Sequence, residues 1–138
     1  MPNDFTPPGL VANGDLSTRQ FYAVRLSGSS GNPFEIASIS SGNFSQRPIG
    51  ILQNDPNSCG QGAEVMVAGV SKVALGGNVT QGDFLSNDCA GRIVAFVLST
   101  GGANTTGGYV FGQALQSGNT TAIIYAIIHS AYPVQTTA

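Results

Sequence analysis

Turn-forming residues divide this chain into short apolar segments, and their spacing restricts the possible folds more than any other feature. The chain has 138 residues, of which 19 are glycine and 7 are proline. The segments between them are rich in β-branched and aromatic residues, which favour strands. The predicted strands cover 21–26, 34–39, 49–53, 64–75, 93–98, 109–116 and 120–132, and 79–85 carries a turn at Gly82-Asp83. Many short strands at regular turn spacing indicate an all-β domain, either a small β-barrel or a sandwich.

Two of these segments have patterns of their own. In segment 64–75, Val65 and Val67 point to one side, both faces are largely apolar, and Gly69 offers a place for a bulge. In segment 120–132, four isoleucines also fit one face of a helix. Its β-branched and aromatic content favours a strand. Both segments are expected to supply core and intersubunit contacts.

The two ends of the chain differ from the middle. Pro2, Pro7, Pro8 and Gly9 forbid a regular helix or a central strand near the start. We therefore expect an extended N-terminal arm over 1–20, a β-domain over 21–132 and a loose C-terminal tail over 133–138.

The arm carries spaced apolar side chains that would bind a partner surface, either a larger protein assembly or neighbouring copies. These residues are Phe5, Leu10, Val11 and Leu16. The alternative is a frayed terminus without a binding role.

Charge is sparse. Only 9% of the residues are charged, against about 25% in an ordinary soluble domain. A surface with so little charge is poorly protected against association, which favours an obligate oligomer or a large assembly over an ordinary neutral β-protein. The five basic residues are scattered and form no stripe that would neutralise phosphates, so we expect no nucleic-acid partner.

The ends of the chain and its cysteines bear on where it folds. The start, MPNDFTPPGL, lacks a basic region followed by an apolar block, and no apolar stretch is long enough to span a bilayer. We therefore expect folding in a cytoplasm and no membrane partner. Cys59 and Cys89 lie in polar turns, and free thiols are favoured over a bridge there.

No constellation of residues predicts catalysis, a metal site or a cofactor. His129 is the only histidine, and no Gly-x-Ser-x-Gly elbow accompanies it. The acidic residues lie mostly in turns, where an aspartate such as Asp83 usually accepts hydrogen bonds from nearby backbone. No small-molecule substrate is expected. The sequence therefore predicts a protein that is not an enzyme.

Segment 77–85 also resembles corners of biotinyl and lipoyl carrier domains, which are flattened β-barrels. Those domains present a modified lysine at an exposed hairpin tip. The only lysine, Lys72, lies between Ser71 and Val73, ahead of the Gly-Gly turn. It lacks the methionine or acidic flanks of that tip, which disfavours a carrier.

Segment 47–95, together with a shorter stretch near the C-terminus, resembles the small decoration or cement proteins on the outside of tailed-phage heads. The matching words are GILQNDP at 50–56, the strand from Glu64 to Val73, Gly82-Asp83, the turn from Asp88 to Arg92, and GQAL at 112–115.

The resemblance implies a small β-tulip-like domain, a homotrimer and the major capsid protein as partner. It implies a virion protein, assembled in the host cytoplasm, that caps threefold positions on the exterior of the expanded head and stabilises it. The alternative is a β-structural module of a phage tail or fibre.

Overall fold

The computed structural model describes residues 6–28, 33–40, 46–96 and 107–135. Within these ranges the chain is all-β, which confirms the predicted class. No helix there is long and apolar enough to cross a membrane. The strands are β1 (Val11–Ala12), β2 (Ala23–Leu26), β3 (Glu35–Ser38), β4 (Pro48–Leu52), β5 (Val65–Met66), β6 (Gly69–Ala74), β7 (Phe84–Asn87), β8 (Ile93–Ala95), β9 (Gly107–Ala114) and β10 (Ile123–Gln135).

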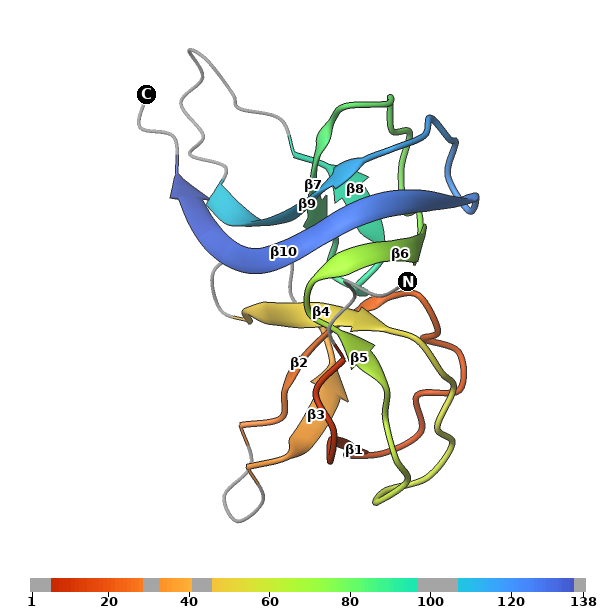
Figure 1. Cartoon of the computed structure of the whole chain (residues 1–138), viewed down its shortest axis with the longest axis vertical. Coiled ribbons are helices and arrows are strands. Elements are labelled where there is room, and N and C mark those ends of the chain that lie inside the picture. Colours follow the sequence, from red (N-terminus) through yellow and green to blue (C-terminus); the bar gives the residue numbers. More distant parts are fainter. Residues whose placement is uncertain (1–5, 29–32, 41–45, 97–106, 136–138) are drawn as a thin grey trace.

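The first five strands form the lower sheet in Figure 1, in the order β1-β3-β2-β4-β5. Its pairs are antiparallel except for β1 with β3. The two edges approach each other, because Ala12 N donates to Gln61 O and Ala63 N donates to Leu10 O, both at 2.9 Å. The sheet therefore curls into a small barrel.

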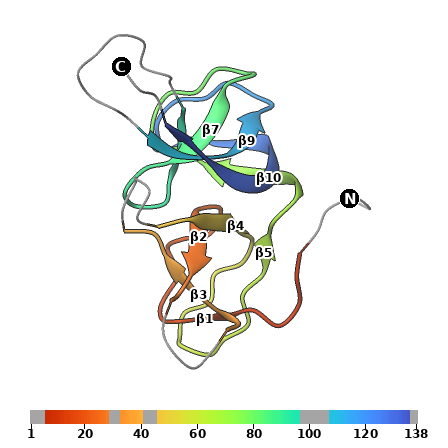
Figure 2. The same ribbon diagram turned by 90° about the vertical axis from the view of Figure 1, so that its left-hand side faces the viewer.

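The last five strands form the upper sheet in the order β6-β10-β9-β7-β8, with every pair antiparallel. Its edges also meet, through a parallel bridge between Leu75 and Ile93 and a 2.8 Å bond from Gly76 N to Ile93 O. Figures 1 and 2 show the two sheets stacked along the long axis of the molecule. The prediction of a small barrel or sandwich is thus confirmed.

Strands β2 and β4 lie between two hydrophobic cores. Ala23 and Ile51 are buried in the core of the upper sheet, together with Phe111 and Leu85 among others. Their chain neighbours Val24 and Leu52 are buried in the core of the lower sheet. Because successive side chains of a strand point to opposite faces, two short strands serve both cores.

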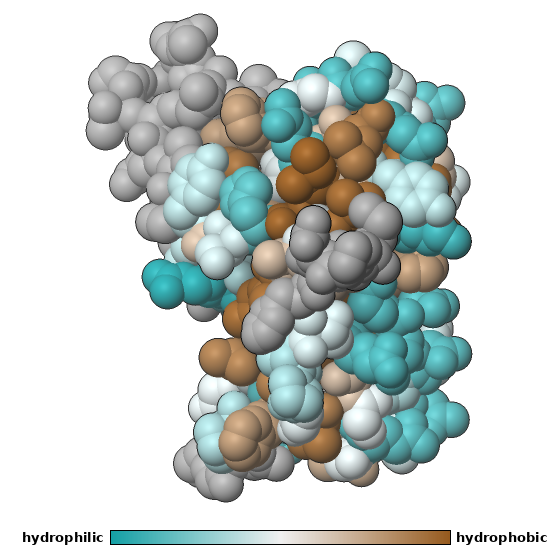
Figure 3. Space-filling model, viewed as in Figure 1, coloured by the Kyte–Doolittle hydropathy of each residue, from teal (hydrophilic) through white to brown (hydrophobic). Residues whose placement is uncertain are grey.

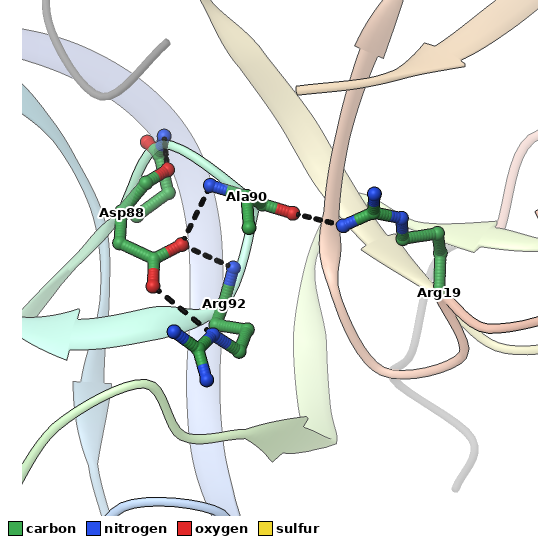
Figure 4. Close-up of polar contacts among 5 residues, drawn as sticks. Arg19, Asp88, Ala90 and Arg92 are labelled. Atoms are coloured by element: carbon green, nitrogen blue, oxygen red, sulfur yellow. Dashed lines mark hydrogen bonds and ion pairs between the residues drawn. The ribbon is translucent and has the colours of Figure 1, made fainter. Parts of the chain in front are cut away.

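A turn of the upper sheet docks on the lower sheet. Asp88 Oδ1 accepts hydrogen bonds from the backbone amides of Ala90 and Arg92, each at 2.9 Å, and Oδ2 lies 3.2 Å from Arg92 Nε. The turn so formed presents Ala90 O to Arg19 Nη1 at 2.7 Å (Figure 4). It also presents Gly91 O to Ala23 N at 2.8 Å. These contacts fix the two sheets relative to each other.

The expected domain boundaries need correction at both ends. The described part of the arm, residues 6–20, does not extend away from the domain, because β1 pairs with β3 and its Ala12 is fully buried. Residues 133–135 of the expected tail belong to β10, where Pro133 pairs with Tyr109 and Gln135 with Gly107. Because backbone pairing joins both segments to the sheets, the described part of the arm and residues 133–135 belong to the β-domain.

Segment 64–75 is not one strand. It breaks after Met66, so that β5 closes the lower sheet and β6 begins the upper one. Gly69, with a φ of 124°, occupies the crossing, where the sequence indicated a bulge. Val65 and Val67 both pack on the lower core, as their spacing predicted.

Candidate interaction surface

The side chains that could in principle take part in catalysis or metal binding make contacts within the fold. His129 Nδ1 lies 2.9 Å from Ser130 O, and its ring stacks on Tyr132 with 5.6 Å between centroids. Asp83 Oδ2 accepts the Thr80 amide at 2.9 Å, which confirms the predicted turn role. Among the described residues, no group of His, Cys, Asp and Glu side chains has the arrangement to hold a metal ion.

The cysteines, Asp15 and Lys72 also show no arrangement typical of a catalytic or carrier site. Cys59 and Cys89 are both exposed free thiols. Hydrogen bonds from the hydroxyl and the backbone amide of Ser17 lower the pKa of the Asp15 carboxyl. Lys72 lies on β6 with its Nζ 5.9 Å from the centroid of the Phe21 ring, not at a hairpin tip.

The apolar residues predicted to bind a partner are largely used within the chain itself. Leu16 is 4% exposed and lies in the core of the lower sheet, and Leu10 packs against the same core. Val11 is half-buried in β1, while Phe5 lies outside the described residues. A side chain that fills its own core presents no surface to a partner, so the predicted binding role of Leu16 is corrected here.

A different set of large apolar side chains is exposed, on the outer face of the upper sheet. They are Ile123, Tyr125 and Ile127 on β10 and Phe84 on β7, with exposed fractions of 54%, 46%, 42% and 53%. We call this set the β10 face. The alternate residues of β10, Ile124, Ala126 and Ile128, are buried in the core beneath.

Strand register makes the β10 face continuous. Phe84 pairs with Gln113 of β9, Gln113 pairs with Ile127 of β10, and Ile127 pairs with Val70 of β6. Tyr125 pairs with Lys72 in a neighbouring row. In Figure 3, hydrophobic surface gathers in the upper half of the molecule, the half that holds β10.

The β10 face has little charge to keep other proteins away. Lys72 is the only lysine, arginine, aspartate or glutamate in the five strands of the upper sheet. Exposed sheets commonly carry charged side chains that disfavour association. Fully burying a side chain as large as isoleucine or tyrosine contributes about 1.5–3 kcal/mol, so this surface suits contact with another protein.

The sequence indicated contacts from segment 120–132 but not which side chains make them. IIYAII is apolar at every position, so alternation alone does not separate core from surface. The only distinguishing signal is Ala126 between two large residues, since a small side chain suits a crowded interior.

Comparison with known proteins bears on the fold. No family model matches the sequence, and no curated protein matches it. Among solved structures, the chain is similar to the N base of head fiber gp8.5 in bacteriophage phi29. The two share 21% sequence identity with a TM-score of 0.61, over 94% of this chain and 96% of that chain. The likeness therefore covers both stacked sheets, and it is a likeness of fold.

Proposed function

We propose that this chain is a structural protein of a tailed-phage head, which binds the outside of the expanded head at threefold positions and stabilises it. The single observation that carries the proposal is the β10 face, four large apolar side chains exposed on a nearly uncharged sheet. Such a surface suits permanent association with other protein chains. The fold likeness to a phage head fiber base supports the same setting.

The proposed action is mechanical. The partner is the major capsid protein, and each copy bridges several capsid subunits. A protein that binds the expanded lattice and not the unexpanded one stabilises the expanded state by linkage. This role requires neither catalysis nor a cofactor.

We further propose that the protein is a homotrimer whose copies meet through the β10 face. Three copies of one apolar face can meet around a closed threefold axis, which limits this contact to three chains and leaves the other surfaces of the domain for the head. Ile123, Tyr125 and Ile127 lie two residues apart on the longest strand, so they form a row on one face that can meet the same row of another copy.

A second candidate function is the base module of a fibre, or another β-structural part of a tail or fibre. The observation that favours it is that the similar structure is the N base of a head fiber. In that case the chain would attach an elongated appendage rather than cement the lattice.

Co-sedimentation tests the head-binding proposal. Purified protein is mixed with heads of the phage that encodes it, assembled without this chain, in expanded and unexpanded forms. Saturable binding to expanded heads alone is the expected result. Binding to neither form would overturn the cement role, and electron microscopy of labelled virions would then show whether the chain belongs to a tail or fibre.

The trimer proposal is tested by replacing Ile123 and Ile127 together with threonine, which keeps β-branched side chains in the strand. Both positions are about half exposed, so we expect the fold to persist and the trimer to dissociate into monomers in analytical ultracentrifugation. Phe34→Ser, at an equally exposed apolar residue before β3, is the matched control and should leave the trimer intact. A double variant that remains trimeric would contradict the proposed interface.

A further inference from the structure

Two of the five basic residues lie side by side at one end of the lower sheet. Arg25 is in β2 and pairs with Pro48, and Arg47 directly precedes Pro48 in the adjacent strand β4. With Leu26, Gly28, Gln46 and Ile49 they line an open pocket of about 280 Å³. The pocket is separate from the β10 face, whose residues all come from the upper sheet.

Both guanidinium groups are held in place by the chain itself. Arg25 Nε donates to Ser38 O at 3.0 Å, and its Nη1 donates to Leu26 O at 3.2 Å and Ser27 O at 2.9 Å. Arg47 lies over the ring of Tyr109 from the upper sheet, with 5.4 Å between Cζ and the ring centroid. Side chains already ordered in this way lose little further freedom when they bind a ligand.

Among the residues that the structure describes, no ion pair joins either arginine to an acidic side chain, and no acidic residue lines the pocket. Within the described part of the chain, the ion pair that forms is Asp88 with Arg92, in the turn between β7 and β8. Glu35, on the strand next to β2, accepts the Ser27 hydroxyl at 3.0 Å. The amide of Gln46 is bound to Ser40 at both its oxygen and its nitrogen.

The chemistry of the lining selects the ligand. Backbone carbonyls occupy Nε and Nη1 of Arg25, while Arg47 is exposed and stacked on an aromatic ring, which leaves donors for an anionic group. Leu26 and Ile49 form apolar walls, and Leu26 is 51% exposed. A carboxylate on a short methylene chain fits both the arginine donors and the apolar walls. The planar guanidinium can bind both carboxylate oxygens, and the walls contact the methylenes.

We propose that the Arg25–Arg47 pocket is a recognition site for a glutamate or aspartate side chain presented by a partner protein. The inference does not depend on the head-binding role, because its test uses a small probe. The probe is the blocked dipeptide acetyl-Leu-Glu-amide, and its neutral counterpart acetyl-Leu-Gln-amide has the same shape without the charge.

The experiment is an NMR titration of isotope-labelled full-length protein with each peptide. We expect saturable shifts of the Gly28 and Arg47 amides and of Arg25 Nε, with a Kd of about 1–10 mM for the Glu peptide and at least about tenfold weaker binding of the Gln peptide. Equal effects of both peptides, or shifts scattered over the surface, would overturn the proposal. Displacement by an equal concentration of inorganic phosphate would assign a general oxyanion site and also overturn it.

A matched pair of variants locates the binding. Arg47→Gln should weaken binding of the Glu peptide at least about tenfold, since it removes one of the two charges. Lys72→Gln lowers the net charge equally on β6 and should leave binding unchanged. Unchanged binding to R47Q would exclude this pocket. The Glu/Gln comparison in the unmodified protein decides the question even if R47Q does not fold.

Discussion

Glycines that look alike in the sequence carry different constraints in the structure. Gly82 and Gly91 both follow turn sequences, and both have positive φ, 94° and 87°. A Cβ at Gly82 would meet no atom within 4 Å, whereas one at Gly91 would lie 2.8 Å from Ala23 O, in the contact between the two sheets. The turn at Gly91 was predictable from the sequence, but this close approach involves a distant strand and was not.

Alanine substitution at these two positions separates backbone strain from steric clash. Gly82→Ala is expected to lower the free energy of unfolding by about 1 kcal/mol, because a left-handed conformation is strained for alanine. Gly91→Ala adds a clash with backbone and is expected to cost about 2–4 kcal/mol. Urea unfolding followed by circular dichroism measures both values. If both variants lost the same free energy of unfolding, the backbone at the contact between the sheets would be able to move aside for the added methyl group.

Local patterns predicted most strands but not their partners. Segments 49–53 and 109–116 of the prediction correspond to β4 and β9, because apolar residues between turn signals indicate strands wherever the partner lies. The two-residue strand β1 was missed, and segment 64–75 was read as one strand instead of two. Pairing of β1 with β3, and the crossing at Gly69, depend on contacts between distant parts of the chain.

The end of β10 offers a test at the scale of one element. The sequence predicted a loose tail from residue 133, but residues 133–135 pair with β9. A chain that ends at Tyr132 should therefore be less stable by about 1–3 kcal/mol than one that ends at Gln135, since it loses backbone hydrogen bonds worth about 0.5–1.5 kcal/mol each. Hydrogen exchange should accelerate at residues 107–109, the former partners. Equal stability and equal exchange rates in the two chains would instead support the predicted loose tail.

Across the whole molecule, the sequence predicted association through segment 120–132 and through the apolar residues of the arm, and the structure gives these two sets different surroundings. Sparse charge indicated association, and the exposed β10 face fits that indication. Phe5, Leu10, Val11 and Leu16 were chosen because they stand among polar residues, yet Leu16 fills the lower core. Which apolar residues remain outside depends on how much interior two small barrels can provide, and that quantity is a property of the assembled fold.

The stacked arrangement also predicts how the protein unfolds. Because β2 and β4 contribute side chains to both cores, neither sheet keeps its interior when the other unfolds. Leu52→Ala in the lower core and Leu85→Ala in the upper core should each cost about 2–5 kcal/mol and shift one common transition.

Native-state hydrogen exchange checks this by comparing amides of β3 with amides of β9 under increasing urea. In both variants the two sets should merge into a single opening reaction with the same urea dependence, since the loss of either core exposes the strands that the cores share. Leu26→Ala provides the control, because Leu26 lies on β2 with its side chain half exposed and should leave that reaction nearly unchanged. If β3 amides opened at lower urea than β9 amides in L52A alone, the two barrels would be independent folding units. Strands β2 and β4 would then stay folded with the upper sheet when the lower core is lost.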